Sequence, residues 1–211
     1  TIVNSTFAYN IAVHKGGGIY NMSEVTITGS TFYGNEYLES YYSGGFGSGG
    51  ALYNASLMTL TNTLLSNNRG DITANCGGTF TDGGGNLIDT ANGGACKGIT
   101  PLIDADPLLG AFNGTYIPLL AGSPAIDAAP NCAGLTHDQI GTPRPQGPAC
   151  DIGAIEALAL APDITPEPTP DATAPPSLNE WHAEADEDRA HAWGLTDGVQ
   201  GTVHMWEGAW Q

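Results

Sequence analysis

Residues 1–10, TIVNSTFAYN, return as TITGSTFYGN at residues 26–35 and as TLTNTLLSNN at residues 59–68. The copies are separated by 25 and 33 residues, and GGGIYN at residues 16–21 returns as GGALYN at residues 49–54. Short β-branched runs separated by Gly and Asn, in a unit near 25 residues, are typical of one coil of a parallel β-solenoid. Amyloid-like aggregation and a β-propeller are the alternatives, but a propeller blade needs about 40–45 residues. The repeat therefore predicts an all-β fold of stacked parallel coils.

Stacked coils lie about 4.8 Å apart, so equivalent residues of successive coils form ladders. We expect inward ladders of apolar side chains and one corner ladder of asparagines, namely Ile2/Ile27/Leu60, Phe7/Phe32/Leu65, Ile19/Leu52 and Asn10/Asn35/Asn68. Asparagine suits a corner because it tolerates left-handed backbone and its stacked amides bond one another. The eight additional residues of the second coil fall around residues 39–48, where we expect a surface loop. The last full coil is expected between residues 70 and 96, with short strands at 79–81 and 86–88.

Residues 122–156, GSPAIDAAPNCAGLTHDQIGTPRPQGPACDIGAIE, follow the repeats and contain many prolines and glycines. Such a segment makes neither a helix nor a central strand. It holds its shape by wrapping over a folded surface and by covalent cross-linking. We therefore expect residues 100–156 to close the coils of residues 1–99.

The four cysteines are Cys76, Cys96, Cys132 and Cys150, which allow three pairings. We favour the sequential pairs Cys76–Cys96 and Cys132–Cys150, because each joins neighbours in the chain. The second pair closes a loop of about 19 residues, which is worth about 3 kcal/mol. A zinc site is the alternative, but no two cysteines have the CxxC spacing. Two disulfides favour an oxidising compartment, and we expect a secreted, extracellular or cell-surface protein.

Three motifs of the closing segment resemble a known bacterial family: GSPAID at residues 122–127, DQxGxxRP at residues 138–145 and CDIGAIE at residues 150–156. They are similar to the closing segment of choice-of-anchor Q surface proteins, with polymorphic outer-membrane-protein-like repeats. Ile140 and Ile155 depart from that family's usual arginine and phenylalanine. The resemblance covers residues 1–156 and implies a right-handed parallel β-helix at the cell surface. It implies no activity.

The chain carries 22 acidic residues against five Lys and Arg, a net charge of −17. Binding of nucleic acid or of an anionic membrane requires clustered cations, so both are excluded as partners. No apolar run is long enough to span a bilayer, and we expect no membrane insertion.

Residues 157–177 contain six prolines and predict an extended linker. All four tryptophans follow it, within residues 178–211. So short a segment cannot bury four indoles by itself, and it needs a surface to dock on. We expect its apolar side chains to form a subunit interface: Trp181, Trp193, Val203, Met205, Trp206 and Trp210.

No catalytic set, metal site or cofactor site emerges from the sequence. Asp104 and Asp106 alternate before Pro107 and are best interpreted as solvated turn residues. His137 and Asp138 are adjacent in an extended segment, so their side chains point in opposite directions. His182, Glu184, Asp186, Asp188 and His191 lack the spacing of a metal site. We therefore predict a protein that is not an enzyme and binds no cofactor.

Four Asn-x-Ser/Thr sequons are candidate glycosylation sites, at Asn4, Asn21, Asn54 and Asn113. Asn21 and Asn54 occupy equivalent places in successive coils, so glycans there would form a row. Surface glycans are also a candidate partner.

A solenoid that starts inside a coil exposes unpaired backbone groups, which another chain can pair with. We hypothesise that the tail of one subunit docks on a neighbouring copy, head to tail, and builds an extracellular filament or sheath. Two alternatives are a fragment of a cell-surface adhesin with an anchoring tail and a β-helix that binds or degrades carbohydrate.

Overall fold

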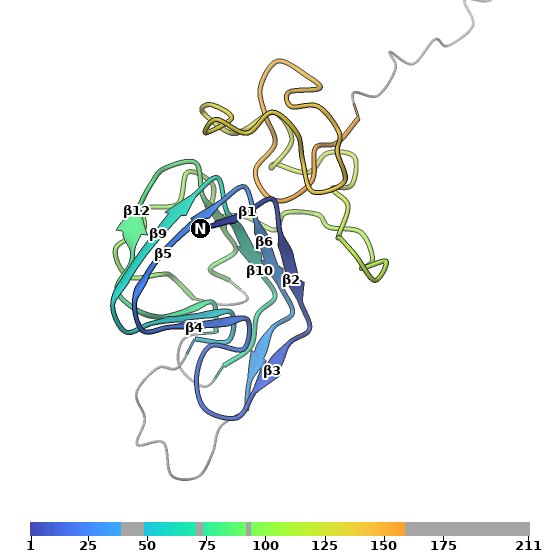
Figure 1. The fold of residues 1–211 in the computed structure, drawn as a ribbon. Coiled ribbons are helices and arrows are strands. Elements are labelled where there is room, and N and C mark those ends of the chain that lie inside the picture. The colour runs from blue at the N-terminus through green and yellow to red at the C-terminus, as the bar shows by residue number, and fades with distance from the viewer. Residues whose placement is uncertain (39–48, 71–73, 92–93, 159–211) are drawn as a thin grey trace, which may run out of the picture. The chain divides into compact units, whose positions relative to one another are not determined.

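The computed structural model divides the chain into two units, Thr1–Leu160 and Ala161–Gln211. It describes residues 1–38, 49–70, 74–91 and 94–158, which contain β-strands and no helix. Most of the expected linker, the tryptophan-containing tail and the loop at residues 39–48 lie outside the described residues. Figure 1 shows the described residues, which all belong to the first unit, as a coloured ribbon.

The described residues of this unit form thirteen short strands. In chain order they are β1 (Ile2–Val3), β2 (Thr6–Ala8), β3 (Ile11–Ala12), β4 (Ile19–Asn21), β5 (Glu24–Thr28), β6 (Thr31–Tyr33), β7 (Glu36–Tyr37), β8 (Leu52–Asn54), β9 (Leu57–Thr61), β10 (Leu64–Ser66), β11 (Cys76–Gly78), β12 (Thr81–Asp82) and β13 (Leu87–Ile88). Glycine, asparagine or serine lies between most neighbouring strands, so each strand ends where the backbone must turn a corner.

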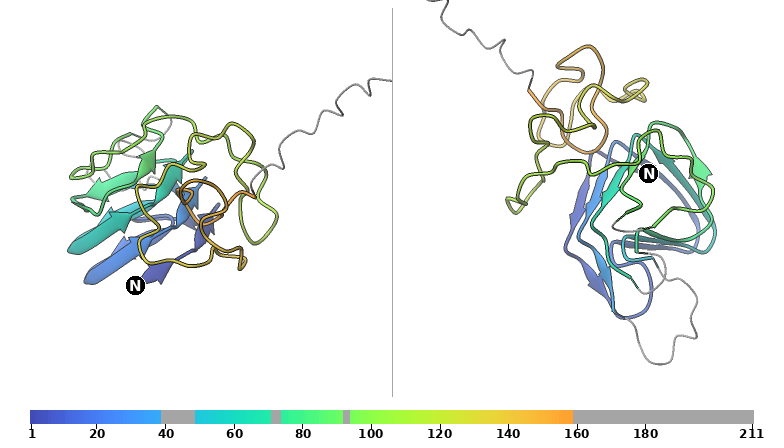
Figure 2. Two further views of the ribbon diagram at one scale, coloured as in Figure 1. Left: turned by 90° about the horizontal axis from the view of Figure 1, so that it is seen from above. Right: turned by 180° about the vertical axis from the view of Figure 1, so that it is seen from behind.

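The strands assemble into four parallel sheets, each of which collects equivalent strands of successive repeats. The orders are β1-β5-β9-β12, β2-β6-β10-β13, β4-β8-β11 and β3-β7. In Figure 2 the strands β1, β5, β9 and β12 succeed one another as parallel arrows. This arrangement is compatible with a parallel β-helix. It contradicts a propeller, whose blades are built from consecutive strands of one repeat.

The predicted inward ladders are confirmed. Ile2 pairs in register with Ile27, and Ile27 pairs with Leu60. Phe7 stacks on Phe32 with ring centroids 4.7 Å apart. The main core contains twelve buried residues: Ile27, Phe32, Ala51, Leu52, Met58, Leu60, Leu65, Cys76, Phe80, Ile88, Cys96 and Ile99. Burial of each large side chain contributes about 1.5–3 kcal/mol, so the stacked interior is the main source of stability.

The asparagine ladder is also confirmed. The Asn10 side-chain amide donates to Asn35 Oδ1 at 2.9 Å, and the Asn35 amide donates to Asn68 Oδ1 at 3.0 Å. Asn68 continues to Asn75 Oδ1 at 2.9 Å, a fourth member that the sequence did not reveal. A second pair joins Asn21 to Asn54 at 2.8 Å. Inside the stack these side-chain amides form hydrogen bonds with one another and with nearby backbone carbonyls. Without these bonds, both kinds of group would be buried without partners.

The closing segment lies against the side of the coils. Leu64 and Leu87 point outward from β10 and β13 and form a second core with Ala125, Ala129, Cys150 and Ile152. In both views of Figure 2 the yellow and orange chain lies beside the blue and teal strands. The stack itself is continued by Ile103, which bridges to Leu87, and by Lys97, whose carbonyl accepts from Phe80 N. The segment therefore packs against a folded surface along the side of the coils.

Contacts from this segment reach three successive coils. The Asn4 side-chain amide donates to His137 O at 2.6 Å in the first coil, and Ala154 N donates to Thr31 Oγ1 at 3.0 Å in the second. In the third, the Asn62 side-chain amide donates to Asn131 O at 2.7 Å. Residues 122–156 thus form a strap that ties neighbouring coils together from outside.

Candidate functional site

Two features of the described residues are candidates for function: the first coil of the stack and a buried ionic cluster in the strap. The first coil consists of β1, β2, β3 and β4, each of which pairs on one side only, with β5, β6, β7 and β8. Their other backbone edges are unpaired among the described residues, and such edges are templates for a further strand.

Three inward side chains of this coil are less buried than their partners in the second coil. Ile27, Phe32 and Leu52 of the second coil are completely buried, whereas the matching residues Ile2, Phe7 and Ile19 are only partly buried. Several outward side chains of residues 1–22 are also apolar and exposed: Val3, Tyr9, Ile11, Val13, Tyr20 and Met22. An exposed apolar cluster of this kind is typical of an interaction surface.

The charge of this coil differs from that of the whole chain. Residues 1–23 contain no Asp or Glu, although the chain has 22 acidic residues, and they contain Lys15, one of the five Lys and Arg. The Lys15 ammonium lies 4.3 Å from the centre of the Tyr53 ring and donates to its hydroxyl at 3.1 Å. The first coil therefore presents an apolar surface without negative side chains on a strongly acidic protein.

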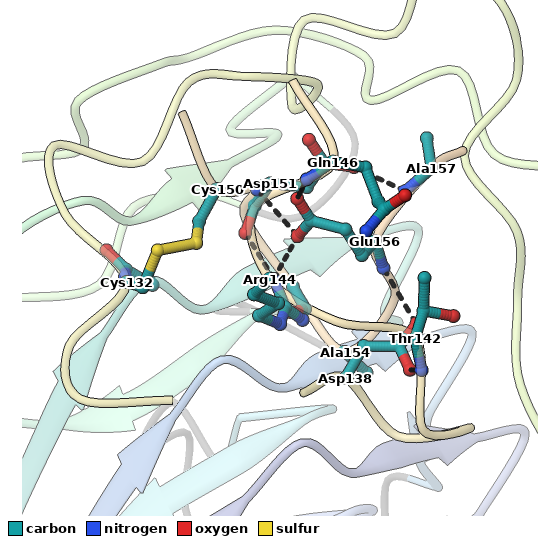
Figure 3. Close-up of polar contacts among 12 residues, drawn as sticks. Cys132, Asp138, Thr142, Arg144, Gln146, Cys150, Asp151, Ala154, Glu156 and Ala157 are labelled. Carbon is teal, nitrogen blue, oxygen red and sulfur yellow. Dashed lines mark hydrogen bonds and ion pairs between the residues drawn. A yellow bond between two sulfur atoms is a disulfide. The ribbon is translucent and has the colours of Figure 1, made fainter. Parts of the chain in front are cut away.

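The ionic cluster is centred on Arg144 (Figure 3). Its guanidinium donates to Glu156 Oε2 and to Asp151 O, both at 2.9 Å, and to Gly153 O at 2.7 Å. Glu156 also accepts from the backbone N–H groups of Gln146 and Asp151. One arginine thus fixes both the last turn of the strap and the carboxylate that ends it.

Two further carboxylates complete the cluster. Asp138 accepts from Ile140 N and Thr142 N through Oδ1 and from Glu156 N through Oδ2. Asp151 accepts from Asp127 N at 2.7 Å and from Ala157 N at 2.6 Å. Each motif of the closing segment therefore supplies at least one group to a single hydrogen-bonded network.

Burial controls the ionisation of this network. Desolvation lowers the pKa of Arg144, although the carboxylates of Glu156, Asp138 and Asp151 oppose that effect. Desolvation raises the pKa of Asp151 to about 6, against the two N–H donors that favour its charged form. The oxygen atoms of these carboxylates face backbone amides and the guanidinium. The arrangement is suited to holding chain segments together.

A groove of about 780 Å³ lies beside the network and is mostly apolar, with Tyr116, Ile126, Ile140, Ile155 and Leu158 in its lining. The Asp127 carboxylate reaches it but lies against Gly147 and accepts from Ala149 N at 3.3 Å.

The structure confirms some of the residues predicted from the sequence and does not describe others. The disulfides Cys76–Cys96 and Cys132–Cys150 are formed, so the predicted pairing is confirmed. Asp104 is exposed and accepts hydrogen bonds from Thr90, which lower its pKa. The expected interface residues of the tail all lie outside the described part of the chain: Trp181, Trp193, Val203, Met205, Trp206 and Trp210.

The sequons also differ from one another. Asn113 is exposed. Asn21 and Asn54 are 8% and 5% exposed, and the nitrogen of each side chain, to which a glycan would attach, donates to backbone carbonyls and to the ladder. The folded structure has no room for a glycan at these two positions. The row of glycans expected there is incompatible with the packing of the coils.

No protein-family model, curated protein or solved structure matches the chain. Within the described residues, no cluster of three or more His, Cys, Asp or Glu side chains is arranged to hold a metal ion. The same residues contain no helix that could cross a membrane. The two disulfides are compatible with an extracellular location.

Proposed function

We propose that this chain is a secreted, non-enzymatic structural subunit that assembles head to tail, through its first coil, into an extracellular filament or sheath. The observation that carries the proposal is a contrast within the chain. Residues 1–23 have exposed apolar side chains and no Asp or Glu, whereas residues 178–211 contain four tryptophans and seven acidic residues.

We infer a right-handed parallel β-helix of the choice-of-anchor Q type. It is supported by the parallel register of successive repeats and by the convergence of Asp138, Arg144, Asp151 and Glu156, which come from the motifs that carry the resemblance. A location at the cell surface follows from that resemblance and agrees with the disulfides.

The partner is the C-terminal segment of a second copy. Residues 178–211 contain four tryptophans and seven acidic residues against one arginine. The first coil contains exposed apolar side chains and no acidic residue, so the two surfaces are complementary in charge as well as in apolar character. Because the donor and acceptor surfaces differ, repetition of the contact gives a filament and not a closed dimer.

The test measures the mass of the full-length protein by light scattering over a range of concentrations, with electron micrographs of the same samples. We expect the mass to rise with concentration and the particles to lengthen. A Val3→Glu variant places a negative charge on the edge strand β1, where it repels the acidic tail, and should remain a monomer. Leu102→Glu is the matched control, because Leu102 is similarly exposed, lies outside the first coil and should not affect assembly.

A third variant tests whether the tail is the partner, separately from whether the protein assembles. Replacement of all four tryptophans by serine in the full chain should abolish assembly while leaving the first coil intact. A wild-type protein that stays monomeric at every concentration overturns the proposal. A tryptophan-free variant that assembles like the wild type overturns the assignment of the tail as the partner.

A further inference from the structure

Tyr9 occupies a backbone position that its neighbours in the stack fill with other residue types. The residues that follow the paired Ala8, Tyr33 and Ser66 are Tyr9, Gly34 and Asn67. All three have left-handed backbone, with φ of 56°, 63° and 53°. Glycine and asparagine adopt this conformation readily, whereas a bulky side chain is strained in it. Strain held by the surrounding structure is a sign of a functional position.

The Tyr9 ring is held in place yet remains accessible. It packs edge-on against Tyr33 with centroids 5.7 Å apart, and at 59° against Phe112 with centroids 6.0 Å apart. It also lies over Gly34, where any Cβ atom would collide with it. Even so, 55% of Tyr9 is exposed. The fold thus fixes the orientation of an aromatic ring at the surface.

A hollow of about 160 Å³ adjoins this ring. It is lined by residues of three successive coils: Tyr9, Ile11, Gly34, Glu36, Asn67 and Arg69. The backbones of Glu36 and Arg69 bridge between coils, and the only ion pair among the described residues is that of Arg144 with Glu156. Arg69 and Glu36 therefore both line the hollow, and neither side chain has an ion-pair partner in the described part of the chain.

We propose that this hollow binds one sugar residue of a neutral glycan. An aromatic face packs against the C–H groups of a sugar ring, while a guanidinium, a carboxylate and an amide supply the donors and acceptors that sugar hydroxyls require. The opposite charges of Arg69 and Glu36 balance, and the net charge of −17 repels uronate polymers. The volume admits a single ring. Tyr9 and Ile11 also belong to the exposed side chains of the first coil, so binding is measured below the protein concentration at which light scattering shows assembly.

The test measures saturable binding of the full-length protein by calorimetry and saturation-transfer NMR. The probes are hexasaccharides of glucose, mannose, galactose and N-acetylglucosamine, with hexagalacturonate as the charged comparison. We expect at least one neutral probe to bind and the uronate to bind more weakly. Absence of saturable binding to all four neutral probes, or preference for the uronate, overturns the proposal.

A Tyr9→Asn variant tests the residue without damaging the fold, because asparagine already occupies the equivalent position at Asn67. We expect the affinity to fall at least tenfold while the unfolding temperature stays within a few degrees of the wild type. The matched control is Tyr20→Asn, since Tyr20 is 48% exposed and also packs edge-on against a tyrosine, at a site that does not line the hollow. Arg69→Gln should weaken binding as well. Wild-type affinity in Tyr9→Asn, or an equal loss in Tyr20→Asn, contradicts the assignment.

Discussion

Arg144 and Glu156 form an ion pair at 2.9 Å in which the arginine side chain is 2% exposed and the glutamate side chain is completely buried. The two residues stand twelve positions apart, and their contact closes the last turn of the strap. A buried pair of this kind is costly to break, because removal of one partner leaves the other charge without compensation.

Replacement of Glu156 by glutamine should destabilise the protein by about 3–5 kcal/mol, since Arg144 remains buried and charged. The free energy of unfolding, measured by urea denaturation, gives the change. Glu24→Gln is the control, because Glu24 is exposed and its loss should cost less than about 0.5 kcal/mol. Equal values for the two variants would show that the pair does not hold the strap.

Asp151 should make stability depend on pH between about 4 and 7. Its pKa is raised from 3.8 to about 6, so the folded state binds its proton more tightly than the unfolded chain does. The resulting stabilisation is fully present below pH 3.8 and is lost as the pH rises through about 6, by up to about 3 kcal/mol. Asp151→Asn removes this titration. The difference in unfolding free energy between wild type and variant should therefore fall as the pH rises, and a difference that is constant or grows with pH would contradict the prediction.

Substitution of an asparagine in the ladder should lower the stability of the protein most at the centre of the ladder. Asn35 is completely buried, donates to Phe7 O and Asn68 Oδ1, and accepts from Asn10. Asn35→Ala leaves buried groups without partners, at about 1–3 kcal/mol for each. Asn10→Ala, at the exposed end of the same ladder, should cost less than about 1 kcal/mol. Thermal unfolding of the two variants side by side checks the order, and the reverse order would refute it.

Substitution of two glycines by alanine distinguishes the cost of left-handed backbone from the cost of close packing. Gly49 has φ of 58°, and a Cβ atom there would collide with backbone atoms of Leu52 and Gly77. Gly84 has φ of 87°, with nothing within 4 Å of that position. Gly84→Ala should cost about 1–2 kcal/mol from the left-handed backbone alone. Gly49→Ala should cost clearly more, because neighbouring coils must move apart. Denaturant midpoints measure both, and equal losses would mean that the coils do not approach closely at Gly49.

The periodic part of the fold was predictable because each coil repeats the same local rules. Equivalent residues at spacings of 25 and 33 identified the inward ladders and Asn10, Asn35 and Asn68. Asn75 was missed because it stands only seven residues after Asn68, so no repeat spacing reveals it. Asn21 and Asn54 were interpreted as surface sequons, and only their burial identifies them as a second ladder.

By itself, the sequence determined the stacked parallel strands, the residues of the core and the two disulfide pairs, because these depend on periodic alternation and on cysteines that are neighbours along the chain. The tertiary structure decided that the strap lies along the side of the coils, that Arg144 meets Glu156, and that Tyr9, Glu36 and Arg69 surround one hollow. Those contacts join residues of different coils or of an irregular segment. Their geometry depends on how packed surfaces fit together, and no local pattern encodes that fit.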